Sequence, residues 1–374
     1  MNIFPWIKFE MTQNLKNITG WKTKRKIVVI SVDDYGNVRL NSKKSREALD
    51  RAGLKVLSRF DVYDSLENEE DLLGLYDVLS SVKDKNGNHP VFTAFATPAN
   101  IDFEKMKETS FNEYYYELLP ETFNKLAGYE NVYGLWKEGI KEKLIIPQFH
   151  GREHLNIKML MHLLKAGDKE VLACFDNRSY TSISSRPFPT INFTAALDFF
   201  NFKENTQFDF IIEDGLNAFE KVFGFRARHF NPSGGREHSI LHKTLHNNGV
   251  YFIDAQRFHK EHQGSGKYHR KFYYTGMKNS LGQIFMVRNC VFEPTHDRGV
   301  DWVQFCLKQI DVAFRWNNPA NISSHRVNYC GHISSENRKI GLGSLRILLK
   351  EIAIKWPDVE FMSSVDLMDL INLS

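Results

Sequence analysis

Two adjacent carboxylates, Asp33 and Asp34, directly follow residues 26–32, a mostly apolar run rich in β-branched side chains. Such a run, bounded by Gly and Asn, is typical of a buried parallel strand, and ligands of α/β folds bind beyond the carboxyl ends of these strands. One carboxylate of the pair could therefore bind a metal ion while the other accepts a proton. The alternative is that one Asp caps the next helix and the other tolerates the turn, which is the commoner arrangement for an isolated pair.

Two histidines, His150 and His154, follow a second apolar run at residues 144–149. Their spacing places both imidazoles on one side of the first helical turn, which suits two ligands of a single ion. Histidines spaced in this way are more often incidental surface or capping groups. Their position at the end of a buried strand, like that of the carboxylate pair, favours metal binding.

A third strand end carries His325, after the apolar residues 320–324. A histidine at this position suits general acid–base chemistry, because its unperturbed pKa of about 6.5 lets it exchange a proton near neutrality. The alternative is a core histidine that is hydrogen-bonded to a backbone carbonyl. Judged without the other two positions, the two interpretations are equally good.

Strand and helix patterns alternate along the whole chain. Apolar runs predict strands at residues 26–32, 90–96, 144–149, 226–230, 250–254, 284–292, 320–324 and 359–363. Helical periodicity predicts helices at residues 41–52, 68–82, 133–143, 155–166, 194–200, 208–223, 238–248, 300–316, 344–356 and 365–373. Buried strands that alternate with helices predict a parallel α/β barrel. No internal repeat or linker is visible, so we expect one domain over residues 26–374, preceded by an N-terminal extension over residues 1–25.

The composition is that of an ordinary globular protein. The 374 residues are 42% hydrophobic and 25% charged, and the net charge of +4 is too small to indicate nucleic-acid binding. No Cys-x-x-Cys pair is present, so neither a zinc knuckle nor a redox motif is visible, and a reducing compartment is expected. We read no export signal, and no run reaches the roughly 18 apolar residues of a membrane helix, so a cytoplasmic protein is expected.

The three strand ends together resemble the motifs of the polysaccharide deacetylase family, carbohydrate esterase family four. The first motif of that family, Thr/Ser-Phe-Asp-Asp-Gly, corresponds to residues 31–36, Ser-Val-Asp-Asp-Tyr-Gly. The second, His-Ser/Thr-x-x-His, corresponds to residues 150–154, His-Gly-Arg-Glu-His, and Leu-x-x-His corresponds to residues 322–325, Ile-Ser-Ser-His. The resemblance frames residues 26–373 and implies a distorted barrel of seven or eight parallel strands.

The resemblance also implies a role for each of these residues. Asp33 would be the catalytic base, and His325 the acid. Asp34, His150 and His154 would bind one divalent metal ion, for which Zn²⁺ is the expected identity. A metal-bound water would attack an N-acetyl carbonyl and release acetate from an amino sugar. Because neighbours on a strand point to opposite faces, Asp33 and Asp34 can fill both roles only if the strand breaks there, which we expect at residues 35–36.

One family motif is poorly matched. The Arg-Pro-Pro-Tyr-Gly segment, whose Arg orients the base in that family, corresponds only to residues 230–234, Phe-Asn-Pro-Ser-Gly. Arg226 and Arg228 alternate on one face of the predicted strand at residues 226–230, and either could reach Asp33. Arginines paired with structural carboxylates are an equally good interpretation of both.

The sequence therefore predicts a metal-dependent deacetylase that acts on an N-acetylated sugar or a sugar-containing polysaccharide precursor. A carbohydrate is the expected partner, and the oligomeric state is open. A glycoside hydrolase of the same superfamily is the first alternative, with Glu153 or Asp176 as the second carboxylate that it requires. A non-catalytic barrel that binds glycan is the other alternative.

Weaker features complete the prediction. Insertions are expected near residues 97–144 and 256–282, the first of which would reshape the substrate cleft. The second is rich in basic and aromatic residues and is expected to form a loop or hairpin, either solvated or suited to sugar rings and an anionic group. His238, His242 and His246 are predicted to form a solvated stripe on one helix, and Trp302 is assigned to the core.

Overall fold

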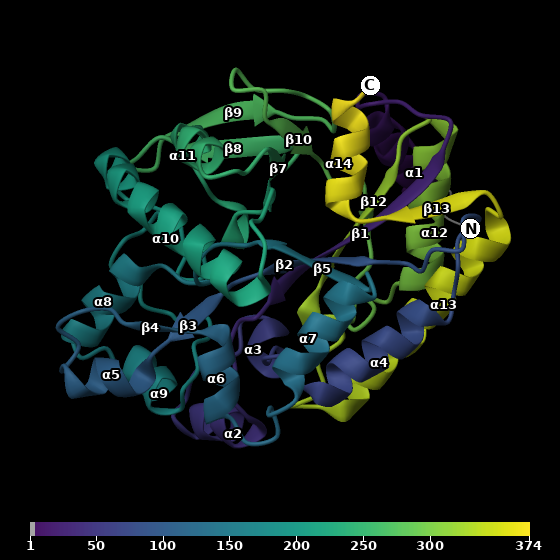
Figure 1. Cartoon of the computed structure of the whole chain (residues 1–374). Coiled ribbons are helices and arrows are strands. Elements are labelled where there is room, and N and C mark those ends of the chain that lie inside the picture. Colours follow the sequence, from purple (N-terminus) through teal and green to yellow (C-terminus); the bar gives the residue numbers. More distant parts are fainter. Residues whose placement is uncertain (1–3) are drawn as a thin grey trace.

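A single curled sheet forms the centre of the protein (Figure 1). The computed structural model describes residues 4–374, with the side chains of residues 9–374, and every strand pairing within the main sheet is parallel among these residues. Its strands are β1 (Lys26–Tyr35), β2 (Phe92–Ala96), β5 (Ile145–Phe149), β6 (His229–Phe230), β7 (Phe252–Asp254), β10 (Ile284–Met286), β11 (Cys290–Val291), β12 (Ala320–His325) and β13 (Val359–Met362).

The strand order is β10-β7-β6-β5-β2-β1-β12-β11, with β13 paired to the first residues of β1. The two ends of this order, β10 and β11, are consecutive in the chain and are joined by residues 287–289. The sheet is therefore a barrel that stays open at one seam, and the prediction of a distorted parallel α/β barrel is confirmed. The strand predicted at residues 284–292 is in fact split into two by this seam.

Helices cover the outside of the sheet (Figure 1). They are α1 (Phe4–Asn17), α2 (Lys43–Arg51), α3 (Phe60–Tyr63), α4 (Glu69–Ser80), α5 (Phe103–Glu108), α6 (Leu119–Lys125), α7 (Val132–Lys141), α8 (Ile157–Lys165), α9 (Lys169–Asp176), α10 (Asn205–Phe223), α11 (His242–Asn247), α12 (Trp302–Arg315), α13 (Ser335–Lys355) and α14 (Ser364–Asn372). Helices α7, α4, α13, α12 and α1 pack in this order as one continuous row. None of the helices in the described part of the chain has the length and apolar character needed to span a membrane.

Two helix predictions were wrong. Residues 194–200 form turns rather than a helix. Helix α13 begins at Ser335 instead of residue 344, because the side chain of Ser334 caps its first turn by accepting a hydrogen bond from the Asn337 backbone. Glycines such as Gly341 interrupt the helical periodicity in this first half of the helix, so the sequence did not predict it. Only glycine fits at position 341, because a Cβ would collide with the Asn328 carbonyl.

Two hairpins lie outside the main sheet. Strands β3 (Ala99–Ile101) and β4 (Tyr116–Leu118) pair within the segment expected as the first insertion, and β8 (Phe258–His262) pairs with β9 (Tyr268–Phe272) within the second. Both pairs are antiparallel. The expectation of a hairpin in residues 256–282 is confirmed.

The N-terminal helix α1 packs against the open seam of the barrel. The side-chain amide of Asn289, in the seam, donates a hydrogen bond to Oδ1 of Asn17 at 2.9 Å. Asn318 donates to the backbone carbonyl of Asn17 at 2.7 Å. The ring of Phe9 lies 5.2 Å from that of Phe305 on α12, measured between centroids. Asn17, at the end of the helix, therefore binds the side-chain amides of Asn289 in the seam and of Asn318 just before β12.

Strand β1 is buried from Ile27 to Tyr35, which explains its continuous apolar run. It pairs with β12 up to Asp33, opposite His325. Against β2 its register shifts between Val32 and Tyr35, so that two residues of β1 stand opposite one residue of β2, as in a β-bulge. Asp34 has a φ of 77°, which is uncommon for a residue with a side chain. The break lies at the carboxylate pair itself, just before residues 35–36 where it was expected.

The turn after this bulge contains Gly36, where we expect alanine to destabilise the protein more than it does at Gly53, a glycine outside the turn. Gly36 and Gly53 both have positive φ, 74° and 79°, but a Cβ at Gly36 would collide with the carbonyl oxygen of Thr97, whereas nothing lies within 4 Å of one at Gly53. Gly53→Ala should cost about 1 kcal/mol of unfolding free energy from backbone strain alone. Gly36→Ala should cost about 1–3 kcal/mol more from the collision. Urea unfolding measures both, and equal losses would contradict the tight approach at Gly36.

Candidate metal centre and active site

Three side chains predicted as metal ligands meet at the carboxyl ends of β1 and β5. Oδ1 of Asp34 lies 3.0 Å from Nε2 of His154 and 3.6 Å from Nε2 of His150. One ligand atom from each residue lies within 4.8 Å of the others, and all three residues are buried. An oxygen and two imidazole nitrogens are a common protein ligand set for Zn²⁺, with further positions left for water and substrate.

The hydrogen bonds of His150 fit this role. Its Nδ1 lies 2.8 Å from the carbonyl oxygen of Asn231, which can only accept, so Nδ1 carries the proton. Its Nε2 is then left with a free lone pair, and it is buried with no hydrogen-bond partner among the described residues. A histidine that donates from one nitrogen to a carbonyl and offers the other is typical of a metal ligand. The group Asp34, His150 and His154 could therefore bind a metal ion.

The carboxylate of Asp34 is ionised. Burial by itself would raise its pKa, but the adjacent imidazoles of His150 and His154 outweigh burial and hold the pKa well below 3.8. The carboxylate can thus act as a negatively charged ligand at any pH near neutrality.

The other carboxylate of the pair, Asp33, is held by Arg288. The guanidinium of Arg288 donates from Nη2 to Oδ1 of Asp33 at 2.7 Å and from Nη1 to Oδ2 at 2.9 Å. The side-chain amide of Asn231 donates a further hydrogen bond to Oδ1 at 2.8 Å. Arg288 also donates from Nε to Asp254 at 2.8 Å and lies over the ring of Phe95. A bidentate arginine of this kind fixes the orientation of the carboxylate.

The expectation that Arg226 or Arg228 reaches Asp33 was wrong. Arg228 forms two hydrogen bonds with Asp369 at the surface. Arg226 binds the backbone carbonyl of Asn248. Both arginines lie before the two-residue strand β6, so neither sits at the strand end. The alternative, that such arginines pair with structural carboxylates, agrees with the contacts of Arg228 with Asp369 and of Arg226 with Glu220.

No sequence motif marks Arg288. It lies in residues 287–289, which cross the open seam of the barrel, whereas the sequence predicted one uninterrupted strand there. The available signal was a charged residue inside a mostly apolar run, residues 284–292, because an arginine that is buried there needs a counter-charge. Which carboxylate it meets depends on the closure of the barrel.

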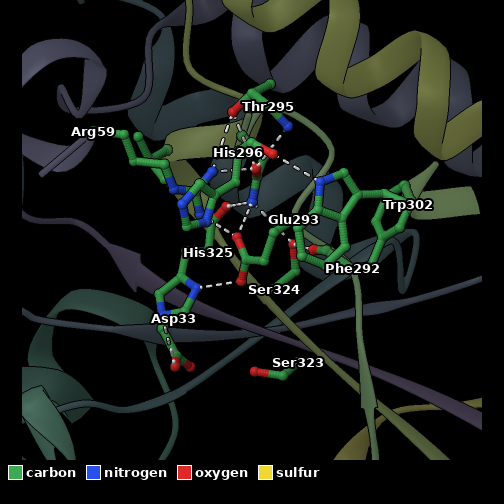
Figure 2. Close-up of polar contacts among 12 residues, drawn as sticks. Asp33, Arg59, Phe292, Glu293, Thr295, His296, Trp302, Ser323, Ser324 and His325 are labelled. Atoms are coloured by element: carbon green, nitrogen blue, oxygen red, sulfur yellow. Dashed lines mark hydrogen bonds and ion pairs between the residues drawn. The ribbon is translucent and has the colours of Figure 1, made fainter. Parts of the chain in front are cut away.

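Figure 2 shows His325 with one ring nitrogen toward Glu293 and the other toward Asp33. Nδ1 of His325 donates to Oε1 of Glu293 at 2.6 Å, and Nε2 lies 3.8 Å from Oδ2 of Asp33. Glu293 is itself buried and accepts hydrogen bonds from Arg59 and Asn328. The sequence analysis did not identify Glu293, which follows the short strand β11 by two residues.

The Glu293 carboxylate sets the charge of His325. Burial alone would lower the pKa of His325, but the charge of Glu293 and its hydrogen bond reverse this effect and raise the pKa to about 9. In turn the positive charge of His325 outweighs burial and holds the pKa of Glu293 below its usual value. His325 therefore carries a proton at neutral pH that it could donate.

Five of the seven predicted site residues line one cavity of about 840 Å³, whereas Arg226 and Arg228 do not. These five are Asp33, Asp34, His150, His154 and His325. Arg288 and Asp254 line the same cavity. Burial raises the pKa of Asp254 to about 6, although Arg288 opposes this shift.

The wall of the cavity differs from the expected one. No residue of the first insertion, residues 97–144, lines it, so the expectation that this segment reshapes the cleft was wrong. Part of the cavity wall is instead formed by residues 182–194, in the loop that follows α9. Neither Glu153 nor Asp176 lines the cavity. Glu153 is buried against Arg152, and Asp176 is exposed and pairs with Lys107 at 2.8 Å.

The predicted histidine stripe was also wrong. His238 is buried and caps the short turn at Ser239–Leu241, and His242 is buried at the start of α11. Only His246 is partly exposed. Trp302 is buried as expected, and its indole donates to the carbonyl of His296.

Fold and site together define a parallel α/β barrel protein with a buried Asp-His-His group that could hold a metal ion. No protein-family model matches the chain, and no curated protein sequence matches it. Solved structures are similar in fold. A probable polysaccharide deacetylase from Pseudomonas aeruginosa has 10% identity and a TM-score of 0.45, with 92% of this chain and 91% of that chain covered.

Two further structures show the range of these likenesses. Puue allantoinase has 11% identity and a TM-score of 0.45, with 93% of this chain and 91% of that chain covered. A 4-alpha-glucanotransferase from Thermococcus litoralis has 8% identity and a TM-score of 0.46. The match covers 92% of this chain but only 40% of the glucanotransferase chain. These identities and TM-scores are too low to assign the chain to one family or to one reaction.

The metal site predicts which variants lose the ion. Purified protein should carry about one divalent ion per chain. Asp34→Ala and His150→Ala should each weaken its binding by at least about 100-fold, because each removes a ligand rather than a supporting group. Metal analysis after dialysis measures the loss. His269→Ala, at an exposed position in β9, is the matched control, and full retention of metal in both site variants would refute the assignment.

The Glu293 contact predicts the titration of His325. In metal-free protein its imidazole should titrate with a pKa of about 9, and Glu293→Gln should lower this pKa clearly, because Glu293 raises it more than Asp33 or Asp34 does. The stability that ionised His325 provides should be complete below about pH 6.5 and be lost as the pH rises through about 9. NMR titration measures the pKa of His325 in both proteins. Unfolding at several pH values measures the pH dependence of the stability. Glu351→Gln, exposed on α13, is the control. A pKa that stays near 9 in Glu293→Gln would count against this pairing.

Proposed function

We propose that this protein is a metal-dependent hydrolase that removes the acetyl group from an N-acetylated sugar or from a sugar-containing polysaccharide precursor. One observation carries the proposal. The base, the acid and the three metal ligands implied by the family resemblance come from strands far apart in the sequence, yet they line one cavity. The combination of an Asp-His-His group with a separate carboxylate and a protonated histidine suits hydrolysis of an amide.

Asp34, His150 and His154 would hold the metal ion. When bound, a divalent ion there supplies Lewis-acid chemistry that polarises the amide carbonyl. Asn231 supports this arrangement twice, because its carbonyl orients His150 and its side-chain amide binds Asp33. The single residue thereby links the orientation of a ligand to that of the base.

Asp33 is placed to accept the proton of the attacking water. Its two oxygens are held by Arg288 and Asn231, so the carboxylate does not need to reorient during the reaction. Asp254 also binds the Arg288 guanidinium, so the positive charge of Arg288 is divided between two carboxylates and does not fully neutralise Asp33. Asp33 is therefore the proposed general base.

His325 is placed to protonate the departing nitrogen. It carries a proton at neutral pH because of Glu293, and its Nε2 lies on the side of Asp33. A side-chain exposure of 31% leaves this nitrogen within reach of a bound ligand. His325 is therefore the proposed general acid, and Glu293 is the residue that positions it.

The two residues proposed for the glycoside hydrolase alternative do not line the cavity. That reaction needs a second carboxylate in the cavity, and neither Glu153 nor Asp176 is there. Two other carboxylates line the cavity: Asp254, which is bound to Arg288, and Glu237, whose Oε1 lies 3.8 Å from Nε2 of His242. Deacetylation is thus the better-supported proposal.

Asp33→Asn tests the proposal. The variant keeps all three metal ligands but cannot accept a proton, so acetate release should fall by about 10²–10⁴-fold while metal content is unchanged. Acetate release is measured over a panel of N-acetylated sugars, nucleotide sugars and glycolipids. Asp176→Asn, a charge removed from the exposed end of α9, is the matched control and should remain fully active. Equal activity in the two variants would contradict the role of Asp33.

A further inference from the structure

Five arginines line the active-site cavity: Arg39, Arg186, Arg236, Arg257 and Arg288. Three of them have carboxylate partners. Arg288 binds Asp33 and Asp254, Arg39 lies 3.4 Å from Asp61, and Arg236 lies 3.3 Å from Asp198. For Arg186 and Arg257, no carboxylate of the described residues lies within 4 Å. Two positive charges in the wall of the substrate cavity are therefore uncompensated.

We propose that the cations of Arg186 and Arg257 favour an acetylated substrate that carries negative charge, on a phosphate or a carboxylate. The inference rests on the proposed function, because it specifies the substrate class of the same cavity. The expected substrate is then an anionic acetylated sugar, such as a sugar phosphate, a nucleotide sugar or an acidic sugar, rather than a neutral one.

Arg257 is a partly buried cation without a counter-charge. It lies between β7 and β8, where its Nη1 donates to the hydroxyl of Thr19 at 2.8 Å and its guanidinium lies over the ring of Phe272. Burial lowers its pKa, which means that the charged form has lost solvation that no acid replaces. An anionic ligand would supply the missing charge, and a charge-assisted hydrogen bond to it would be stronger than one to a neutral group.

The surroundings of Arg257 are positive as well. Burial and the charge of Arg257 both lower the pKa of Lys22, so the two cations lie close enough to repel each other. Among the described residues, the ammonium group of Lys22 donates to the backbone carbonyls of Asn17 and Trp316, which do not cancel its charge. Lys22 does not line the cavity, but its charge adds to the positive potential around Arg257, and that potential attracts anions.

Arg186 is exposed but is held in place by the backbone. Its Nη1 donates to the carbonyl of Ile183 at 2.6 Å and to that of Ser185 at 3.1 Å. Its Nε and Nη2 have no hydrogen-bond partner among the described residues. The guanidinium is thus anchored through one nitrogen while the others remain free, which lowers the entropic cost of binding a ligand.

The size of the cavity agrees with a substrate larger than one neutral sugar. Its volume of about 840 Å³ lies near the upper end of the range for small-molecule sites, about 300–1,000 Å³. A single acetylated sugar would leave much of it empty. The arginines come from two separate loops, one after α9 and one after β7, so they present cations from different parts of the wall.

Calorimetric titration of the full chain tests the proposal with three probes. N-acetylglucosamine 1-phosphate carries a phosphate, N-acetylneuraminate carries a carboxylate, and N-acetylglucosamine is the neutral comparison. At least one anionic probe should bind about 10-fold more tightly than the neutral one, and the advantage should shrink at high salt. Which probe it is identifies the anionic group.

Arg186→Gln and Arg257→Gln should each weaken binding of that anionic probe by about 10-fold and leave binding of N-acetylglucosamine unchanged. Arg51→Gln, which removes a charge from the exposed end of α2, is the control for net charge. The same titrations in metal-free Asp34→Ala protein separate the arginines from the metal, because binding of an anion to the metal is lost there while the arginine effect remains.

Two outcomes separate this inference from the proposed function. Equal affinity for neutral and anionic probes, or unchanged affinity in both arginine variants, would overturn the inference even if a neutral sugar is deacetylated. Arginine-dependent binding of an anionic probe without any acetate release would uphold the inference and refute the deacetylase assignment.

Discussion

The site depends on a break in one strand. Asp33 and Asp34 are adjacent in β1, and neighbours on a regular strand point to opposite faces. The bulge against β2 and the positive φ of Asp34 remove this alternation, so both carboxylates line one cavity. Aspartate tolerates this backbone conformation better than most residues, and the strain is of the kind found at functional sites. Gly36 and the burial of β1 hold the break in place.

Each carboxylate of the pair has its own electrostatic environment. Asp34 faces two imidazoles, whereas Asp33 faces a guanidinium and an amide. A similar separation applies to the proton donor, since Glu293 keeps His325 charged. In a buried site such pairings have large effects because solvent screens them weakly. Two neighbouring residues of one type can therefore take different chemical roles.

The open seam of the barrel contributes directly to the site. The segment at residues 287–289 crosses the seam, and Arg288 extends from it to Asp33 and Asp254. Asn289 of the same segment is bound by Asn17 of the N-terminal helix. The helix that covers the seam thus supports, through one short segment, the arginine that orients the proposed base. A closed barrel would have paired these residues with a neighbouring strand instead.

The sequence by itself determined most strands of the main sheet, their parallel arrangement and the three strand ends that meet in the cavity, because buried strands and their polar ends leave a local pattern. It did not show that the strand predicted at residues 284–292 is divided at the seam. It also pointed to Asp34, His150 and His154 as one group. Only the tertiary structure decided the partners: Arg288 rather than Arg226 or Arg228 for Asp33, and Glu293 for His325. The physical reason is that a counter-charge for a buried group can come from any part of the chain, and its place is set by how the sheet closes rather than by any local pattern.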